Sequence, residues 1–370
     1  MVNLFTSVAC AVLVITITPS CDRPVSDPMP PKKQVSKQTF KEVPPDSAAL
    51  PYCSAGFAAA LSNQYIFLDY WDDAGFRQYN NLILQPEQLK QTIDNLVYWS
   101  YSHPFRLHDW FDTFQIYNAS GSDSIYFTGY YSPTIRITET PSERFQYPIY
   151  RRPPEGQHSV SRKNIYEGAL KDKQLEIGYA ESLSDIYFMQ VQGSGYAEFS
   201  NGKRLFLAYD GTNGLRYSSI GSFLLGSKEH DIKNISNDGI REYLLNNPTF
   251  LKEILAKDPS FTYFKPIDSY PRGATNIPLV ADYSVAVDKN FLPLGACLLA
   301  KIPQKNKGEI TYDYRILLTQ DAGGGAVHGA GHLDVYCGVG SSGKAKADAL
   351  HHYGELWLLL PKQENYVQIR

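Results

Sequence analysis

The sequence predicts a mainly β protein with a few helices. Three observations support this fold class: short apolar runs are separated by frequent Gly, Pro, Asn and Asp residues, tyrosine occurs 27 times in 370 residues, and only two stretches show helical periodicity. Tyrosine rings pack well on the pleated surface of a sheet. Many short strands joined by turns are typical of barrels and sandwiches rather than of a doubly wound sheet. With 43% hydrophobic residues, the chain can bury more than one core.

The N-terminal segment predicts export. Val8–Ile17 is an apolar run shorter than the ~20 residues of a membrane-spanning helix, and it is typical of a secretory signal. Because the small residues Thr18–Ser20 lead into Cys21, we expect residues 1–21 to be a lipoprotein-type signal peptide with Cys21 acylated. A plain secretory signal cleaved nearby is the alternative. Residues 22–50 are rich in Pro, Lys and Ser, which predicts a disordered linker.

Two helices are expected in the folded part. One covers Pro86–Ser100, where apolar residues recur every three or four positions. The other covers Asn237–Ala256 and breaks at Pro248, with Asn247 as the expected N-cap of its second piece. Short apolar runs predict strands at Ile125–Phe127, Ile186–Val191, Arg204–Tyr209, Ser284–Val287, Ala296–Ile302, Tyr314–Thr319, Leu333–Tyr336 and Glu355–Leu360.

Composition and cysteine spacing exclude several functions. The formal net charge of −3 leaves no basic excess to neutralise a phosphate backbone, so a nucleic-acid partner is not expected. No CxxC pair and no HExxH pattern occurs, so we expect neither a metal site nor a cofactor. Cys53, Cys297 and Cys337 lie beyond the N-terminal segment, and the sequence leaves open whether two of them form a bridge.

The densest group of candidate catalytic residues is the segment Gln320–Tyr336. A strand runs into Asp321, a glycine-rich loop follows, and a second strand carries Asp334. Two carboxylates brought together by such a hairpin-like excursion suit acid/base chemistry at a glycosidic oxygen. Asp288, which ends the strand Ser284–Val287, is a third candidate. By pattern alone, however, Asp beside Gly is more often a turn residue.

Two further motifs join a strand to a glycine turn. In Gln190–Gly195, the sequence QVQGSG presents an amide and a hydroxyl that could bind sugar hydroxyls, and it matches no phosphate-binding or GxSxG pattern. In Phe127–Pro133, the sequence FTGYYSP displays two rings. A tight turn between strands is the alternative interpretation of the first motif, and hairpin packing that of the second.

The order of these motifs resembles the family of membrane-bound lytic murein transglycosylase A. The similarity covers roughly Tyr126–Lys362, and its joint order is far more specific than any single motif. Two departures are three glycines at Gly323–Gly325 where two are usual, and His328 where many members have Lys. The motifs are FTGYYSP (127–133), FQYPIYRRP (145–153), GAL (168–170), QVQGSG (190–195), YDGTNG (209–214), YSSIG (217–221), DPSFTYF (258–264), SVAVD (284–288), PLG (293–295), QDAGG (320–324) and LDVY (333–336).

The resemblance implies a two-domain architecture with a glycan groove between the domains. Residues 51–132 and 270–370 would form a double-psi β-barrel, and residues 133–269 an inserted, barrel-like β domain. Asp334 would be the acid/base, with a pKa raised by burial and by Asp321. Asp321 and Asp288 would be supporting carboxylates, and the groove would be lined by Thr128, Gly129, Tyr130, Gln192, Ser194 and Gly195.

The resemblance also implies a reaction and a location. The enzyme would be a lytic transglycosylase that cuts the β-1,4 bond between N-acetylmuramic acid and N-acetylglucosamine in peptidoglycan and forms 1,6-anhydromuramyl products. The alternatives are an inverting glycoside hydrolase, with Asp334 as acid and Asp321 as base, and a non-catalytic peptidoglycan-binding lipoprotein. The expected location is the periplasmic side of the envelope, lipid-anchored at the outer membrane, with glycan strands and cell-wall synthesis proteins as partners.

Overall fold

The computed structural model describes residues 40–45, 51, 53–70, 77–79, 81–102, 107–306, 309–323, 327 and 329–362. The expected signal peptide with Cys21, most of the expected linker, Gly324, Gly325 and His328 lie outside the described residues. One part of the linker prediction is wrong: β1 (Phe40–Glu42) is a strand, because the ring of Phe40 is buried in the core and β1 pairs with β4 (Phe111–Ile116). No helix among the described residues is long and apolar enough to cross a membrane.

The first of two barrels is closed by six strands. They follow the order β16–β13–β14–β12–β15–β5, and β5 pairs again with β16. The pairs β12–β14 and β15–β5 are parallel, and the other four are antiparallel. β4 and β1 extend the sheet outward from β16. The strands are β5 (Ile125–Ser132), β12 (Ser284–Val287), β13 (Cys297–Asn306), β14 (Glu309–Ala322), β15 (His332–Val339) and β16 (His351–Pro361).

Helices cover this barrel and complete its core. α1 (Gly56–Asp69) and α2 (Pro86–Ser102) bury Leu68 and Trp99 against the strands. Next to them lie α3 (Leu107–Trp110) and a ribbon of β2 (Arg77–Tyr79) and β3 (Leu82–Leu84), while α9 (Gly340–Ala349) packs on β5 and β15.

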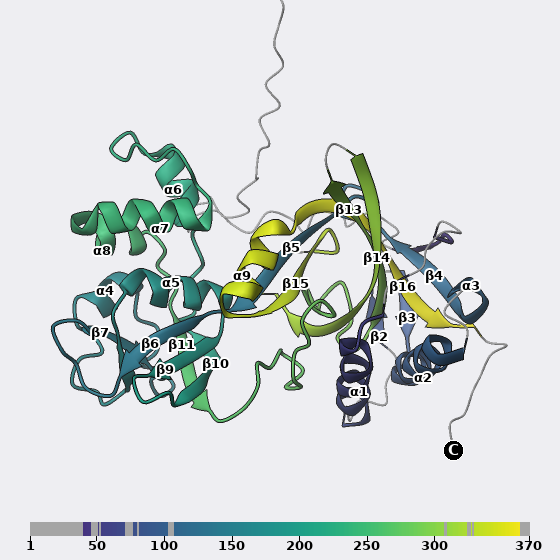
Figure 1. Cartoon of the computed structure of the whole chain (residues 1–370), viewed down its shortest axis with the longest axis horizontal. Coiled ribbons are helices and arrows are strands. Elements are labelled where there is room, and N and C mark those ends of the chain that lie inside the picture. The colour runs from purple at the N-terminus through teal and green to yellow at the C-terminus, as the bar shows by residue number, and fades with distance from the viewer. Residues whose placement is uncertain are drawn as a thin grey trace, which may run out of the picture.

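The second sheet is a nearly closed barrel that follows β5 in the chain after Pro133. Its order is β11–β10–β9–β6–β8–β7, and its edge strands β7 and β11 are not paired with each other. Figure 1 shows the two barrels side by side, with β5 and α9 near their junction. The elements are β6 (Thr134–Thr138), β7 (Tyr147–Tyr150), α4 (Arg162–Tyr166), β8 (Glu176–Ala180), α5 (Leu183–Gln192), β9 (Gly195–Phe199), β10 (Arg204–Thr212), α6 (Ile220–Gly226), α7 (Asn237–Asn246), η1 (Pro248–Phe250), α8 (Leu251–Leu255) and β11 (Thr262–Ile267).

The predicted fold class, a mainly β chain with a double-psi-type barrel, a second barrel and a few helices, is confirmed. One predicted strand is wrong, because Ile186–Val191 lies within the helix α5 instead. Ser182 caps that helix by accepting a hydrogen bond from the N–H of Asp185, and Gly193 ends it in the left-handed conformation. Asn247 precedes η1 as expected, but its amide donates to the carbonyl of Tyr243 and makes no N-cap bond.

The closure of the first barrel depends on a glycine in β16. The beginning of β16 pairs with β5, and the rest pairs with β13 and β4. Gly354 stands where the partner changes, and a Cβ there would lie 2.2 Å from the carbonyl oxygen of Lys301. The chain can therefore cross from one partner to the other only with a bare backbone at this position.

We expect Gly354→Ala to lower the free energy of unfolding by about 1–3 kcal/mol, because overpacking of a filled site forces backbone shifts. Urea unfolding followed by circular dichroism measures this change. Gly226→Ala is the control, because a Cβ at Gly226 meets nothing within 4 Å. Equal stability of Gly354→Ala and wild type would contradict the proposed role of Gly354 in closure.

Candidate active site

Strand register places two aspartates on one face of the first barrel. Ala286 of β12 pairs with Asp321 of β14 on one side and with Asp334 of β15 on the other. Residues paired across neighbouring strands point to the same face. Thr128 of β5 pairs with Asp334 and continues the row. The expected hairpin-like excursion is wrong, because β12 lies between the two strands that carry the carboxylates.

β5 presents two different faces to its surroundings. Thr128 and Tyr130 lie on the face of the two aspartates, where they hydrogen-bond to them. Gly129 lies on the opposite face, where a Cβ would be 2.6 Å from the Cα of Ala347 in α9. Tyr131 is buried against that same helix. Gly129 therefore permits the close approach of α9, and of the two rings expected at the surface only that of Tyr130 reaches the aspartates.

Asp334 is bound by a short chain of hydrogen bonds. The hydroxyl of Thr128 donates to Oδ1 of Asp334 at 2.8 Å, and Nε2 of His332 lies 2.8 Å from the same hydroxyl oxygen. Since the only hydroxyl proton of Thr128 is used on Asp334, Nε2 of His332 must carry the proton of the second bond. His332 was not among the candidates from the sequence, although it stands two residues before Asp334 on the same face of β15.

Burial, together with the negative charge of Asp321, raises the pKa of Asp334 from 3.8 to about 6, while the hydrogen bond from Thr128 acts in the opposite direction. A carboxyl group with this pKa is partly protonated near neutral pH. It can therefore donate a proton as well as accept one, which is the requirement for a single group that serves as acid and then as base.

Asp321 is held in one orientation by three donors. The hydroxyl of Tyr130 donates to Oδ2, and the N–H groups of Ala274 and Ala322 donate to Oδ1, each at 2.8 Å. Burial raises the pKa of Asp321, and these three hydrogen bonds lower it. The ring of Tyr130 also packs on that of Tyr336 at 5.3 Å between centroids. Asp321 therefore orders the residues around Asp334.

The carboxylate of Asp288 accepts hydrogen bonds at the turn that follows β12. Its Oδ1 accepts from the backbone and side-chain nitrogens of Asn290, at 3.0 and 2.9 Å, and its Oδ2 accepts from the N–H of Gly329 at 2.9 Å. Among the described contacts, no hydrogen bond or ion pair joins Asp288 to Asp321 or Asp334. Asp288 fixes the turn after β12 and the far end of the glycine-rich loop.

The QVQGSG motif lies where α5 ends against β5. The side-chain oxygen of Gln192 accepts from the N–H of Tyr131 at 3.0 Å, so its amide nitrogen is left to bind something else. Gly195 has no room for a side chain, because a Cβ would lie 2.8 Å from the carbonyl oxygen of Pro133. Ser194 is half-buried. No cluster of three metal-ligating side chains occurs in the part of the chain that the structure describes.

The fold and this site define a class of two-barrel proteins with an inserted domain. Residues 126–265 match the family described as the MltA specific insert domain, and residues 283–360 match the 3D domain. The chain belongs to the membrane-bound lytic murein transglycosylase A family.

Relatives and solved structures support this assignment. Membrane-bound lytic murein transglycosylase A of Escherichia coli K12 is 40% identical over 254 residues, which cover 67% of this chain and 69% of that protein. The Vibrio cholerae protein of the same name is 36% identical over 66% of this chain and 68% of its own.

The structure of E. coli MltA with bound chitohexaose has a TM-score of 0.73 and 31% identity, covering 88% of this chain and 95% of that one. A membrane-bound lytic murein transglycosylase from Agrobacterium tumefaciens has a TM-score of 0.70 and 25% identity, covering 82% of this chain and 92% of that one.

We expect Asp334→Asn to stabilise the fold at pH 8 by up to about 3 kcal/mol, from ~1.4 kcal/mol per pKa unit. Because the folded-state pKa of Asp334 is raised from 3.8 to about 6, its charge destabilises the fold above pH 6. The penalty shrinks as the pH falls from 6 towards 3.8 and is absent below. Urea unfolding at pH 8 and at pH 4 measures the difference. The same gain at both values would show that ionisation of Asp334 is not its cause.

We expect Thr128→Val to raise the pKa of Asp334 above its wild-type value, because the lost hydrogen bond favours the carboxylate. Valine keeps the shape of threonine and removes the donor. A ¹³C NMR titration of the Asp334 carboxyl in wild type, Thr128→Val and Thr128→Ser tests this. Serine should restore the wild-type value, and an unchanged pKa in the valine variant would exclude the proposed bond.

Proposed function

We propose that this chain is a peptidoglycan lytic transglycosylase with Asp334 as its single acid/base. The observation that carries the proposal is the contrast between the aspartates: Asp321 and Asp288 each accept three hydrogen bonds, whereas Oδ2 of Asp334 accepts none from the described residues. The family membership of the chain and the chitohexaose bound to the E. coli relative support a glycan substrate.

The proposed reaction uses the two protonation states of Asp334 in turn. Because Oδ1 accepts from Thr128, the acidic proton resides on Oδ2. Asp334 donates this proton to the glycosidic oxygen of the leaving N-acetylglucosamine as its bond to C1 of the muramyl ring breaks. The carboxylate then accepts the proton of the muramyl C6 hydroxyl, whose oxygen bonds to C1 and closes the 1,6-anhydro ring. No water is consumed, and Asp334 ends protonated.

The neighbouring residues position this group. His332 donates to Thr128, which donates to Asp334, so the side chain is held in one rotamer. The proposed glycan path follows the face of β5 and β15 that carries Thr128, Tyr130 and Asp334 and passes the free amide of Gln192. Gly129 and Gly195 contribute to this path by the close packing they permit, and Ser194 lies beside it.

The alternative of an inverting hydrolase fits the site less well. Such an enzyme needs a second carboxylate that activates water. The strand register brings Asp321 to this face beside Asp334, and the oxygens of Asp321 are occupied by the hydroxyl of Tyr130 and by two backbone N–H groups. The product therefore distinguishes the two reactions.

We also infer how the domains of the chain are organised and where in the cell envelope it is located. The inserted unit comprises residues 133–269, between the parts 51–132 and 270–370 of the first barrel. Cys21 carries a lipid that anchors the enzyme on the periplasmic side of the envelope, at the outer membrane. The relatives are named as membrane-bound proteins, which supports attachment to a membrane.

We expect mass spectrometry of peptidoglycan digested by the wild-type chain to show 1,6-anhydromuropeptides, and Asp334→Asn to release none, because the amide cannot donate and accept the proton. Asp348→Asn, which changes an exposed carboxylate on α9, is the matched control and should retain activity. Reducing-end products would establish the hydrolase. Undiminished release of anhydro products by Asp334→Asn would exclude Asp334 as the acid/base.

A further inference from the structure

A cavity of about 590 Å³ lies in the second barrel, away from Asp334. It lies beside α4 and along β7, at the seam where β7 and β11 are not paired, and Phe261, which also lines it, directly precedes β11. In Figure 1, β7 and α4 lie at the end of the second barrel that is farther from the first barrel. Its volume is within the roughly 300–1,000 Å³ of small-molecule sites, which often occupy the mouths of barrels. Aromatic rings line it: Tyr147, Tyr150, Tyr166, Tyr179 and Phe261.

One hydroxyl group that lines this cavity has no hydrogen-bond partner in the described part of the chain. The side chain of Tyr150 is only 6% exposed, and its hydroxyl makes no hydrogen bond within the described part of the chain. Tyr150 of β7 pairs with Glu176 of β8, so the phenol and this carboxylate are neighbours on one face of the sheet. Burial and the charge of Glu176 together raise the pKa of Tyr150 to about 12. Glu176 also makes no hydrogen bond or ion pair among the described residues. Glu176 is half-buried, and both groups line the cavity, so both are available to a molecule bound there.

The charges around the cavity are balanced. Lys171 and Lys252 line it together with Asp172 and Glu176, so their formal charges cancel. A site for an anionic peptide would carry an excess of Lys or Arg, whereas these groups suit a neutral ligand with many hydroxyls. A sugar ring combines an apolar face of C–H groups, which packs on aromatic rings, with a rim of hydrogen-bonding groups.

Addition of a peptide strand to the free edge of β7 is disfavoured. β7 has only four residues, and Pro148 lacks the N–H that an added strand would need. The loop that follows α4 instead encloses the cavity with two residues of left-handed backbone, Asp172 at φ 62° and Gln174 at φ 57°. Such conformations are costly for residues other than Gly and cluster at ligand-binding segments.

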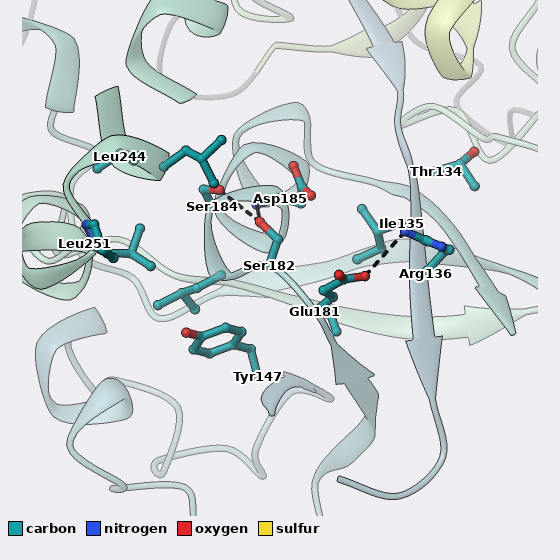
Figure 2. A pocket seen from close by; sticks show the side chains of 14 residues that line it. Thr134, Ile135, Arg136, Tyr147, Glu181, Ser182, Ser184, Asp185, Leu244 and Leu251 are labelled. Atoms are coloured by element: carbon teal, nitrogen blue, oxygen red, sulfur yellow. Dashed lines mark hydrogen bonds and ion pairs between the residues drawn. The ribbon is translucent and has the colours of Figure 1, made fainter. Parts of the chain in front are cut away.

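A second cavity in the same barrel offers a contrast (Figure 2). Its volume is about 530 Å³, and Tyr147 lines both cavities. Its carboxylates already have partners, because Glu181 binds Arg136 and Arg144 while Asp185 binds Arg241. Among the described residues, a glutamate without an ion-pair partner, Glu176, therefore distinguishes the cavity at the β7–β11 seam.

We propose that the cavity at the β7–β11 seam is a second saccharide site, which holds an N-acetylhexosamine unit of a glycan strand at a distance from the cleavage site. The choice of glycan rests on the proposed function. Tyr147 and Tyr179 provide rings at the cavity wall, Tyr150 donates its hydroxyl, and Glu176 accepts from sugar hydroxyls. The site would keep the enzyme attached to a strand while the bond beside Asp334 is cut.

Hydrogen–deuterium exchange of the full chain with chitotetraose tests this proposal, because it reports each site separately. We expect protection of residues 168–176 at the cavity and of residues 126–132 at the active site. Tyr150→Phe and Glu176→Gln should weaken the protection of 168–176 by about 10-fold or more in ligand concentration and leave that of 126–132 unchanged. Tyr270→Phe and Glu242→Gln, at exposed positions outside the cavity, are the matched controls.

If chitotetraose protects residues 126–132 but not residues 168–176, the proposal of a second saccharide site is wrong, whereas the proposed function is unaffected. Protection of 168–176 alone would support the second site and count against glycan binding beside Asp334. If a peptidoglycan stem peptide without sugar protects 168–176 and chitotetraose does not, the saccharide assignment is wrong. Tyr150→Phe retains the ring that packs on Phe261, and its thermal unfolding temperature should match that of wild type.

Discussion

The site depends on one constraint, which is the register of β12 between its two neighbours. Ala286 pairs with Asp321 and with Asp334 at the same time. Because side chains alternate along a strand, a slip by one residue on either side would move one aspartate into the barrel core and bring an apolar neighbour to the surface. Val335 and Leu333, which flank Asp334, are fully buried and make such a slip costly. The apolar core therefore determines the geometry of the polar face.

The aspartates differ because of the hydrogen bonds that each receives. Asp321 and Asp288 are surrounded by donors, many of them backbone N–H groups, so their carboxylates are fixed parts of the scaffold. Asp334 receives one hydroxyl donor and is largely removed from water, which raises its pKa into the range needed for proton transfer. Three residues of the same type thus acquire different properties from their surroundings alone.

The sequence predicted the secondary structure correctly where the apolar periodicity agrees with the positions of the turn residues Gly, Pro, Asn and Asp. The strands around Asp321 and Asp334 and the helix at Pro86 follow from apolar spacing, and the family resemblance supplied the two-barrel architecture. It failed at α5, where a run rich in apolar and β-branched residues is helical because Ser182 and Gly193 cap it.

Contacts between distant parts of the chain could not be predicted from the sequence, because they depend on which strands pair with each other. Nothing local indicates that His332 binds Thr128, that Asp288 holds the glycine-rich loop, or that Gly129 faces α9. These roles arise from strand pairing, which no short window of sequence contains.

The discontinuous first barrel has a consequence for the order of folding. Thr128 and Asp334 are separated by 206 positions, and in the described part of the chain the strand that carries Thr128 pairs with β15 and β16, which both come from the end of the chain. During synthesis from the N-terminus, β5 cannot pair with β15 and β16 until the whole second barrel has been made. Such long-range closure is slow, and until it is complete the open edge of β5 is prone to pair with other chains. The face that carries Thr128 and Asp334 is thus assembled last, and a truncated or half-folded chain cannot bring Asp334 to Thr128.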